Sequence, residues 1–234
     1  MAEGAEFVAT SHLTETDLRR ELAEFKDRYP QLGDDELFVL WFLRAFVAED
    51  EGAAVSALCG GPRDKGVDAV LIDDPARIVF VVQGKYRQKV GAKSEHRGDV
   101  AGFAQIAVDL CGDSPTFASF AKDLSPEVLG RLEEARTRVR KRSYALHMFY
   151  VTMGRCSSAL HDEAGRIVRA ADGTVTFQLF DGRRSFCCSR TTSTAWRRPC
   201  HRSTSKSNRA AASAPPACST ATTARRTSSP GSSP

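Results

Sequence analysis

Three polar side chains lie where two apolar segments of this 234-residue chain begin and end, and their types suit chemistry at a phosphate. Asp68 lies at the start of the first segment, whereas Gln83 and Lys85 lie at the end of the second. A carboxylate and an amide oxygen are donors that Mg²⁺ and Mn²⁺ accept, and an ammonium group can stabilise charge that develops on a phosphate. If the chain brings them together, they suit metal-dependent cleavage of a phosphodiester.

The two apolar segments are expected to form a β-hairpin. Residues 67–72 and 78–82 are short and rich in β-branched side chains, and residues 73–76 between them (Asp-Asp-Pro-Ala) are typical of a turn. With the turn centred in that segment, paired positions sum to about 149 to 151. Asp68 therefore faces one of positions 81–83.

Gln83 and Lys85 are two positions apart, so both project from the same face of their strand. Val79 and Val81 share that face and are expected to belong to the core. Polar groups at the open end of a buried face are costly unless they are paired or used. The alternative interpretation is an ordinary hairpin whose polar ends are solvated.

The motifs around these residues resemble a known nuclease family. Asp-x-Gly-x-Asp at 64–68, an apolar strand, and Val-Val-Gln-x-Lys-Tyr at 81–86 are similar to the PD-(D/E)xK core in its Mrr-type variant, in which glutamine replaces the usual acid. The form of the first motif, with the Gln-Gly-Lys-Tyr that follows, is most similar to the N-terminal part of the abortive infection phage-resistance (AIPR) proteins. The resemblance is dense over residues 60–90 and looser over 30–180. Val67 stands where the family name has proline.

The resemblance implies a restriction-endonuclease-like α/β core, in which helices flank a central mixed sheet. It implies that Asp68 and Gln83 hold Mg²⁺ or Mn²⁺ and that Lys85 stabilises the scissile phosphate or orients the attacking water. An amide carries less negative charge than a carboxylate, so the cation is expected to bind more weakly than in the Glu-containing form. The implied activity is an endonuclease of bacterial anti-phage defence, by abortive infection or restriction, with DNA more than RNA as the expected substrate.

An accessory acid is expected from the preceding helix, which the apolar spacing predicts over residues 34–47 with Asp34 or Asp35 as its cap. By the resemblance, Glu36 is the candidate third metal ligand. The alternative is an acid that simply favours the first turn of a helix. Asp64 has a similar claim, since it lies four residues before Asp68, but Asp-Lys-Gly is also a plain turn.

A basic segment follows the hairpin and suits contact with a nucleic-acid backbone. Residues 86–97 contain few apolar side chains and include Arg87, Lys89 and Lys93, which would add affinity without sequence selectivity. Lys65, before the first strand, is a further candidate for phosphate contact. The alternative for all four is a solvated loop or turn. His96 is a lone histidine with no nucleophile beside it.

The remaining pattern predicts a scaffold of helices and strands, which favours an α/β class with a mixed sheet. Ser125 followed by Pro126 is typical of a helix start. The predicted helices cover 13–28, 100–110, 117–122 and 125–142, and the predicted strands cover 144–153 and 173–180.

The composition changes after residue 182. Residues 183–234 contain no Asp, Glu, Leu, Ile, Val or Met, but they contain ten of the 33 Lys and Arg and four of the seven cysteines. The first 182 residues hold the other 23 basic residues against all 29 acidic ones, so a net charge of +4 averages an acidic domain and a basic tail. Without aliphatic side chains the tail cannot form a core, and we expect it to be disordered.

Two interpretations of the tail remain. One is a basic arm that binds nucleic acid without specificity; the other, which we prefer, is a shifted reading frame of GC-rich DNA that leaves a truncated product. Cys187, Cys188, Cys200 and His201 do not form a zinc motif, because the first two are adjacent and lack the usual two-residue gap. Scattered cysteines elsewhere suit a reducing compartment, and without a signal peptide or a long apolar run the expected location is the cytoplasm.

Three hypotheses for function follow. The first is a Mg²⁺- or Mn²⁺-dependent endonuclease comprising residues 1–182, with its core in 30–182. The second is a catalytically inactive domain of the same fold that binds nucleic acid or a protein partner. The third is a nonfunctional fragment. The expected partners are nucleic acid and, as an open question, a second copy of the chain in a homodimer; no membrane association is expected.

Overall fold

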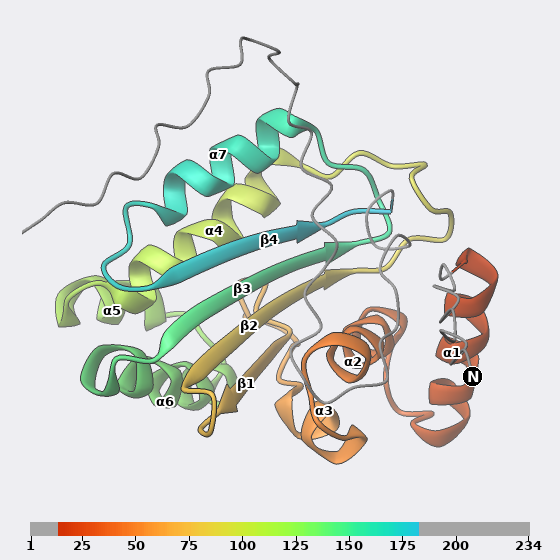
Figure 1. The fold of residues 1–234 in the computed structure, drawn as a ribbon, viewed down its shortest axis with the longest axis horizontal. Helices are drawn as coiled ribbons and strands as arrows, with labels where there is room; N and C mark the ends of the chain where they lie inside the picture. Colours follow the sequence, from red (N-terminus) through yellow and green to blue (C-terminus); the bar gives the residue numbers. More distant parts are fainter. Residues whose placement is uncertain (1–13, 183–234) are drawn as a thin grey trace, which may run out of the picture. The chain divides into compact units, whose positions relative to one another are not determined.

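The computed structural model describes residues 14–182, which form a four-stranded sheet with helices on both faces (Figure 1). The strand order is β1-β2-β3-β4, with β1 antiparallel to β2 and with β2, β3 and β4 parallel to one another. The predicted α/β class with a mixed sheet is therefore confirmed, and the tail expected at 183–234 lies outside the described residues. The strands are β1 (Ala69–Asp73), β2 (Ile78–Lys85), β3 (Ala145–Thr152) and β4 (Val175–Phe180).

The hairpin register agrees with the count from the sequence. Ala69 pairs with Val82 and Asp73 pairs with Ile78, so paired positions sum to 151, at the upper end of the expected range. The amide of Asp68 donates to the carbonyl of Val82 at 2.9 Å, which continues the pairing by one residue. Directly opposed residues share a face, so this pairing places Asp68 beside Gln83.

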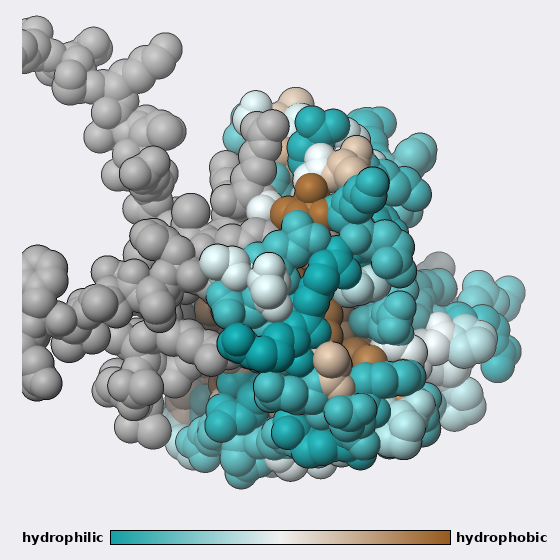
Figure 2. Space-filling model, turned by 90° about the vertical axis from the view of Figure 1, so that its right-hand side faces the viewer, coloured by the Kyte–Doolittle hydropathy of each residue, from teal (hydrophilic) through white to brown (hydrophobic). Residues whose placement is uncertain are grey.

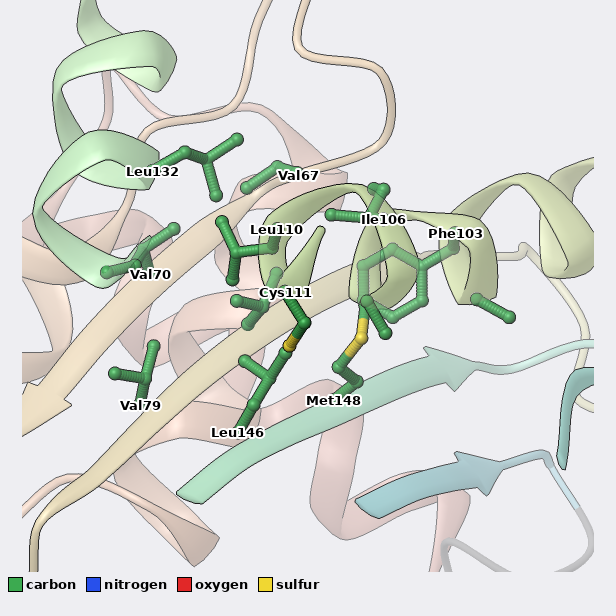
Figure 3. Packing of buried hydrophobic residues seen from close by; sticks show 14 of the residues in the cluster. Val67, Val70, Val79, Phe103, Ile106, Leu110, Cys111, Leu132, Leu146 and Met148 are labelled. Atoms are coloured by element: carbon green, nitrogen blue, oxygen red, sulfur yellow. The ribbon is translucent and has the colours of Figure 1, made fainter. Parts of the chain in front are cut away.

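One face of the sheet packs against four helices (Figure 1). Val79 and Val81 of β2 point into this core, as predicted, together with Leu146 and Met148 of β3 (Figure 3). Phe103 of α4 lies over the same strands. The helices of this layer are α4 (Arg97–Cys111), α5 (Ser114–Ala121), α6 (Pro126–Arg142) and α7 (Ser158–Val168).

The opposite face packs against α2 (Asp34–Phe46), which is covered in turn by α1 (Glu15–Arg28) and α3 (Glu51–Ala57). Seven consecutive residues of α2, 37–43, are buried. A helix that is apolar on all sides needs neighbours on all sides, which the sheet and α1 supply here. This burial fixes the first turn of α2 at the end of β2.

The boundaries confirm some helix predictions and correct others. Ser125 is the N-cap of α6 and accepts a hydrogen bond from the Val128 amide, as its sequence predicts. Asp34 and Asp35 do not cap α2, because its N-cap is Gly33. Helices α3 and α7 were not predicted: α3 is short and rich in alanine and glycine, which gives it no apolar periodicity.

Two further observations concern the cysteines and the apolar character of the helices. Cys59 and Cys111, two cysteines in the described part of the chain, are buried thiols outside any disulfide, and burial raises the pKa of the Cys59 thiol to about 12. Such thiols are unreactive core side chains. No helix within residues 14–182 combines the length and apolar character needed to cross a membrane.

Candidate functional site

Asp68 lies at the end of the sheet where β2 and β3 finish. Its Oδ2 accepts a hydrogen bond from the Gly84 amide at 2.7 Å. Burial raises the pKa of the Asp68 carboxyl to about 6; the Gly84 hydrogen bond and the charge of Lys85 oppose this rise, and the charges of Asp64 and Asp35 add to it. The site therefore holds a carboxylate that burial penalises, a property common at functional sites.

Gln83 is only 4% exposed, and its Oε1 is buried without a hydrogen-bond partner. Its amide rests against the backbone of Gly66, which has a φ of +83°; a Cβ at that position would lie 2.2 Å from Gln83 Nε2. A buried polar atom without a partner costs free energy comparable to a lost hydrogen bond. A ligand that reached this oxygen would recover that free energy.

Lys85 ends β2 and is partly exposed, on the same face of the strand as Gln83. Between them, Gly84 lets α2 approach closely, because a Cβ there would lie 2.4 Å from Val39 Cγ2. The glycine of Gln-Gly-Lys is thus needed for packing, and it leaves its amide free to bind Asp68. The structure brings Asp68, Gln83 and Lys85 to one end of the sheet, as the hairpin count predicts.

The structure gives Glu36 a different partner from the one that the resemblance implies. The Glu36 carboxylate accepts a hydrogen bond from the Gly33 amide at 2.7 Å, so it caps its own helix. Its neighbour Asp35 reaches β2 instead, since its Oδ1 accepts from the Tyr86 amide at 2.7 Å. Asp35, not Glu36, is the acid of α2 whose charge acts on Asp68. A metal-binding role for Glu36 stays a prediction.

Asp64 and Lys65 are both engaged in the loop before β1. Asp64 accepts hydrogen bonds from the amides of Gly61 (2.9 Å) and Gly66 (2.7 Å), which fits the plain-turn interpretation. Lys65 Nζ donates to the carbonyl of Phe120 at 2.6 Å and lies 5.0 Å from the centre of that ring. Contact between Lys65 and a phosphate stays a prediction that would require this bond to break.

The basic segment contains one paired and two exposed candidates. Arg87 forms a two-pronged ion pair with Glu95, at 3.0 and 2.7 Å, whereas Lys89 and Lys93 are exposed. His96 is the N-cap of α4, where its Nδ1 accepts from the Gly98 amide, so it has a structural role. Lys89 and Lys93 are thus the members of the segment best placed to meet a backbone.

Glu95 is a buried acid that the sequence did not indicate. Its side chain is 0% exposed, and its partners are Arg87, the Thr152 hydroxyl at 2.7 Å and the Tyr150 hydroxyl at 3.4 Å. The local sequence, Lys-Ser-Glu-His-Arg, is polar and gives no sign that this acid is buried. Only the contact with β3, 55 residues or more along the chain, reveals its burial.

The donor set at Asp68 and Gln83 fits a hard divalent cation. Both supply oxygen, and Mg²⁺ commonly uses only one or two carboxylates and completes its shell with water and substrate phosphates. In the described part of the chain, no three His, Cys, Asp or Glu side chains are grouped as a metal site. Protein ligands beyond Asp68 and Gln83 are therefore not evident, and the four residues weighed for zinc lie outside the described residues.

The end of the sheet that carries these residues is mostly hydrophilic on its surface (Figure 2). A cavity of about 310 Å³ lies beside it, between α1 and α2, and is lined by Arg19, Leu22 and Tyr86 among others. The basic side chains around this cavity are already bonded: Arg19 to Glu15 and Tyr86, and Lys26 to backbone carbonyls. Asp68 and Gln83 do not line this cavity.

Comparison with known proteins yields no relative for this chain. No protein-family model matches it, and neither a curated protein nor a solved structure matches it significantly.

Proposed function

We propose that this chain is a metal-dependent endonuclease-like domain that binds nucleic acid at the Asp68–Gln83–Lys85 end of its sheet and hydrolyses phosphodiesters. The observation that carries the proposal is the buried, unpartnered Oε1 of Gln83 beside a carboxylate whose pKa is raised to about 6. A buried acceptor without a partner and a carboxylate whose charge burial disfavours each cost the fold free energy, and a bound cation would lower both costs.

Each residue has a distinct task in this proposal. Asp68 and Gln83 would hold Mg²⁺ or Mn²⁺, which when bound supplies a Lewis acid and lowers the pKa of a water ligand. Lys85 places an ammonium beside the phosphate, where it stabilises charge that develops on the oxygens. The Gly84 amide fixes the Asp68 carboxylate through its hydrogen bond. Asp35 holds the chain just after Lys85 and is the better candidate for an accessory acid than Glu36.

The identity as a restriction-endonuclease-like fold, the preference for DNA and a role in anti-phage defence are parts of the same proposal. They rest on the resemblance of the two motifs and on a mixed sheet whose hairpin joins them. The sheet order and the helices on both faces are compatible with such a core.

The test is a cleavage assay of the full chain on plasmid DNA and on a single-stranded RNA, each with Mg²⁺, with Mn²⁺ or with EDTA. We expect cation-dependent cleavage that falls at least about 100-fold in Asp68→Asn, which loses a charged ligand of the cation, and in Lys85→Ala, which loses the ammonium beside the phosphate. Matched controls are Asp109→Asn, a half-buried aspartate of α4, and Lys122→Ala, an exposed lysine after α5. Cleavage that is equal in the wild type and in both site variants would overturn the assignment.

A second function is favoured by one observation. Since Glu36 caps its own helix and no group of three acids is present in residues 14–182, the site offers few negative charges to a cation. A catalytically inactive domain that binds nucleic acid through Lys85, Lys89 and Lys93 would need no bound cation and therefore no further acidic side chains. Binding of the same DNA in a gel-shift measurement, without cleavage, that is lost in Lys85→Ala and kept in Lys122→Ala would favour this function.

A further inference from the structure

The end of β3 and the basic segment after β2 are joined by a network centred on Glu95. Every partner of its carboxylate is a donor: the guanidinium of Arg87 through two nitrogens, and the hydroxyls of Thr152 and Tyr150. The Thr152 hydroxyl lies 2.7 Å from Glu95 and 3.3 Å from the carbonyl of Lys85, and its single proton serves the nearer acceptor. The buried charge is thus compensated on all sides.

Backbone pairing fastens the same segment to the chain after β3. The amide of Gly91 donates to the carbonyl of Met153 at 2.7 Å, and the amide of Arg155 donates to that of Lys93 at 2.7 Å. The amide of Glu95 donates to the carbonyl of Arg155 at 2.9 Å. Residues 91–95 therefore extend the sheet beyond the ends of its strands.

Glycine at position 154 makes room for the acid. A Cβ there would lie 2.1 Å from Glu95 Oε1 and 2.8 Å from the carbonyl of Lys93, so the two segments of the chain are in direct contact. Arg87 lies two residues after Lys85, and Thr152 is the residue of β3 that pairs with Lys85. Glu95 therefore binds the segment after Lys85, through Arg87, and the strand beside Lys85, through Thr152.

We propose that Glu95 is a positioning residue that fastens residues 85–95 to the end of β3 and so presents Lys85, Lys89 and Lys93 together to one nucleic-acid backbone. The inference rests on the proposed function for its ligand. It assigns a task to a buried acid that has no place in phosphodiester chemistry itself. Held in one conformation, the segment binds without first being ordered, which removes an entropic cost of binding.

The test uses Glu95→Gln in the full chain. The amide has nearly the same shape, but in either orientation its NH₂ group faces an N–H of the Arg87 guanidinium, which cannot accept, so the two-pronged pair must break. We expect amide hydrogen exchange over residues 86–93 to become at least about tenfold faster, while exchange in the core of β3 changes little. The matched control is Glu163→Gln, which neutralises the acid paired with Arg97 on an exposed surface of α7.

Nucleic-acid affinity distinguishes a positioning role of Glu95 from the effect of its negative charge alone. Both variants gain one unit of net positive charge, so charge alone predicts tighter binding to a short labelled duplex DNA in each. Positioning predicts instead that Glu95→Gln binds at least about fivefold more weakly, whereas Glu163→Gln binds as well as the wild type or better. Tighter binding by Glu95→Gln, or exchange no faster than in Glu163→Gln, overturns the inference.

The outcomes also separate this inference from the proposed function. A wild type that binds no nucleic acid overturns the proposed function and the ligand named here, whereas the exchange data still decide whether Glu95 fastens the segment. If Glu95→Gln does not fold, the double variant Arg87→Gln with Glu95→Gln avoids an unpaired buried charge and keeps the net charge of the wild type. Its segment should also exchange faster; exchange equal to that of the wild type overturns the fastening.

Discussion

The two ends of the β1–β2 hairpin shift the pKa of an aspartate in opposite directions. At the site end, defined by Asp68, Gln83 and Lys85, burial raises the pKa of an aspartate. At the turn end, Asp74 is exposed and accepts hydrogen bonds from Arg138 and Tyr144, each at 2.9 Å, which lower its pKa. The turn end holds polar groups that are paired with one another, whereas the site end holds a carboxylate whose charge burial disfavours and an amide oxygen without a hydrogen-bond partner.

Glycine provides the largest expected contrast between the ends. Gly66→Ala at the site end strains a positive φ and drives a Cβ into the buried amide of Gln83, 2.2 Å away. We expect a loss of about 3 kcal/mol in the free energy of unfolding, measured by denaturant titration. Gly173, just before β4 at the same end of the sheet as the hairpin turn, has a φ of +113° but nothing within 4 Å of a new Cβ, so Gly173→Ala adds only backbone strain and should cost about 1 kcal/mol. Equal losses would show that the close contact with Gln83 is unimportant.

Asp68→Asn should stabilise the protein above neutral pH. Because the carboxyl pKa is raised to about 6 from 3.8, the native state of the wild type holds its proton more tightly than the unfolded state, and stability is lost as the pH rises through 6. Asparagine keeps an acceptor for Gly84 without the charge. After allowance for partial exposure, we expect a gain of about 2 kcal/mol at pH 8 that vanishes near pH 4.

If Asp68 binds a divalent cation, added cation should reduce the stability difference between Asp68→Asn and the wild type. Added Mn²⁺ should raise the melting temperature of the wild type at pH 8 and leave Asp68→Asn unchanged, since a ligand stabilises only the state that binds it. The wild-type effect should fade as the pH drops below about 6, where the carboxyl becomes protonated. An equal rise in both proteins would place the cation elsewhere.

Asp74→Asn should have the smallest effect and the opposite sign. Its lowered pKa means that the folded state gains stability above the pKa of the unfolded carboxyl and loses it as the pH falls. The variant is therefore expected to melt slightly lower than the wild type at pH 7, with the difference shrinking in acid and in high salt. Thermal unfolding across pH measures this; a variant that melts higher at pH 7 would contradict the contrast between the ends.

The hairpin could be derived from the sequence because its geometry is local. Alternation and turn composition fix which residues of 67–85 oppose each other, and the observed register lies within the predicted range. The choice between Asp35 and Glu36 could not be made in the same way. Adjacent residues on a helix differ by about 100° in direction, so only the packing of α2 on β2 decides which acid reaches the site.

Glu95 and the glycines show a second limit of sequence analysis. The burial of Glu95 depends on Thr152 and Tyr150, which are far away in the chain, and its charged neighbours indicate a solvated loop. Gly66 and Gly84 read as turn or strand-end glycines, yet each is required by a side chain from another segment. Such close approaches leave no pattern in the local sequence.

The strand order also sets a sequence of events for folding. Asp68 and Gln83 meet through a hairpin of neighbouring residues, whereas β2 pairs with β3 only after the chain has crossed from Ile78 to Ala145. Local contacts form faster than contacts that close long loops. The Asp68–Gln83 pair can thus assemble early, and the network that holds Lys85 between Arg87 and Thr152 is completed only when β3 docks.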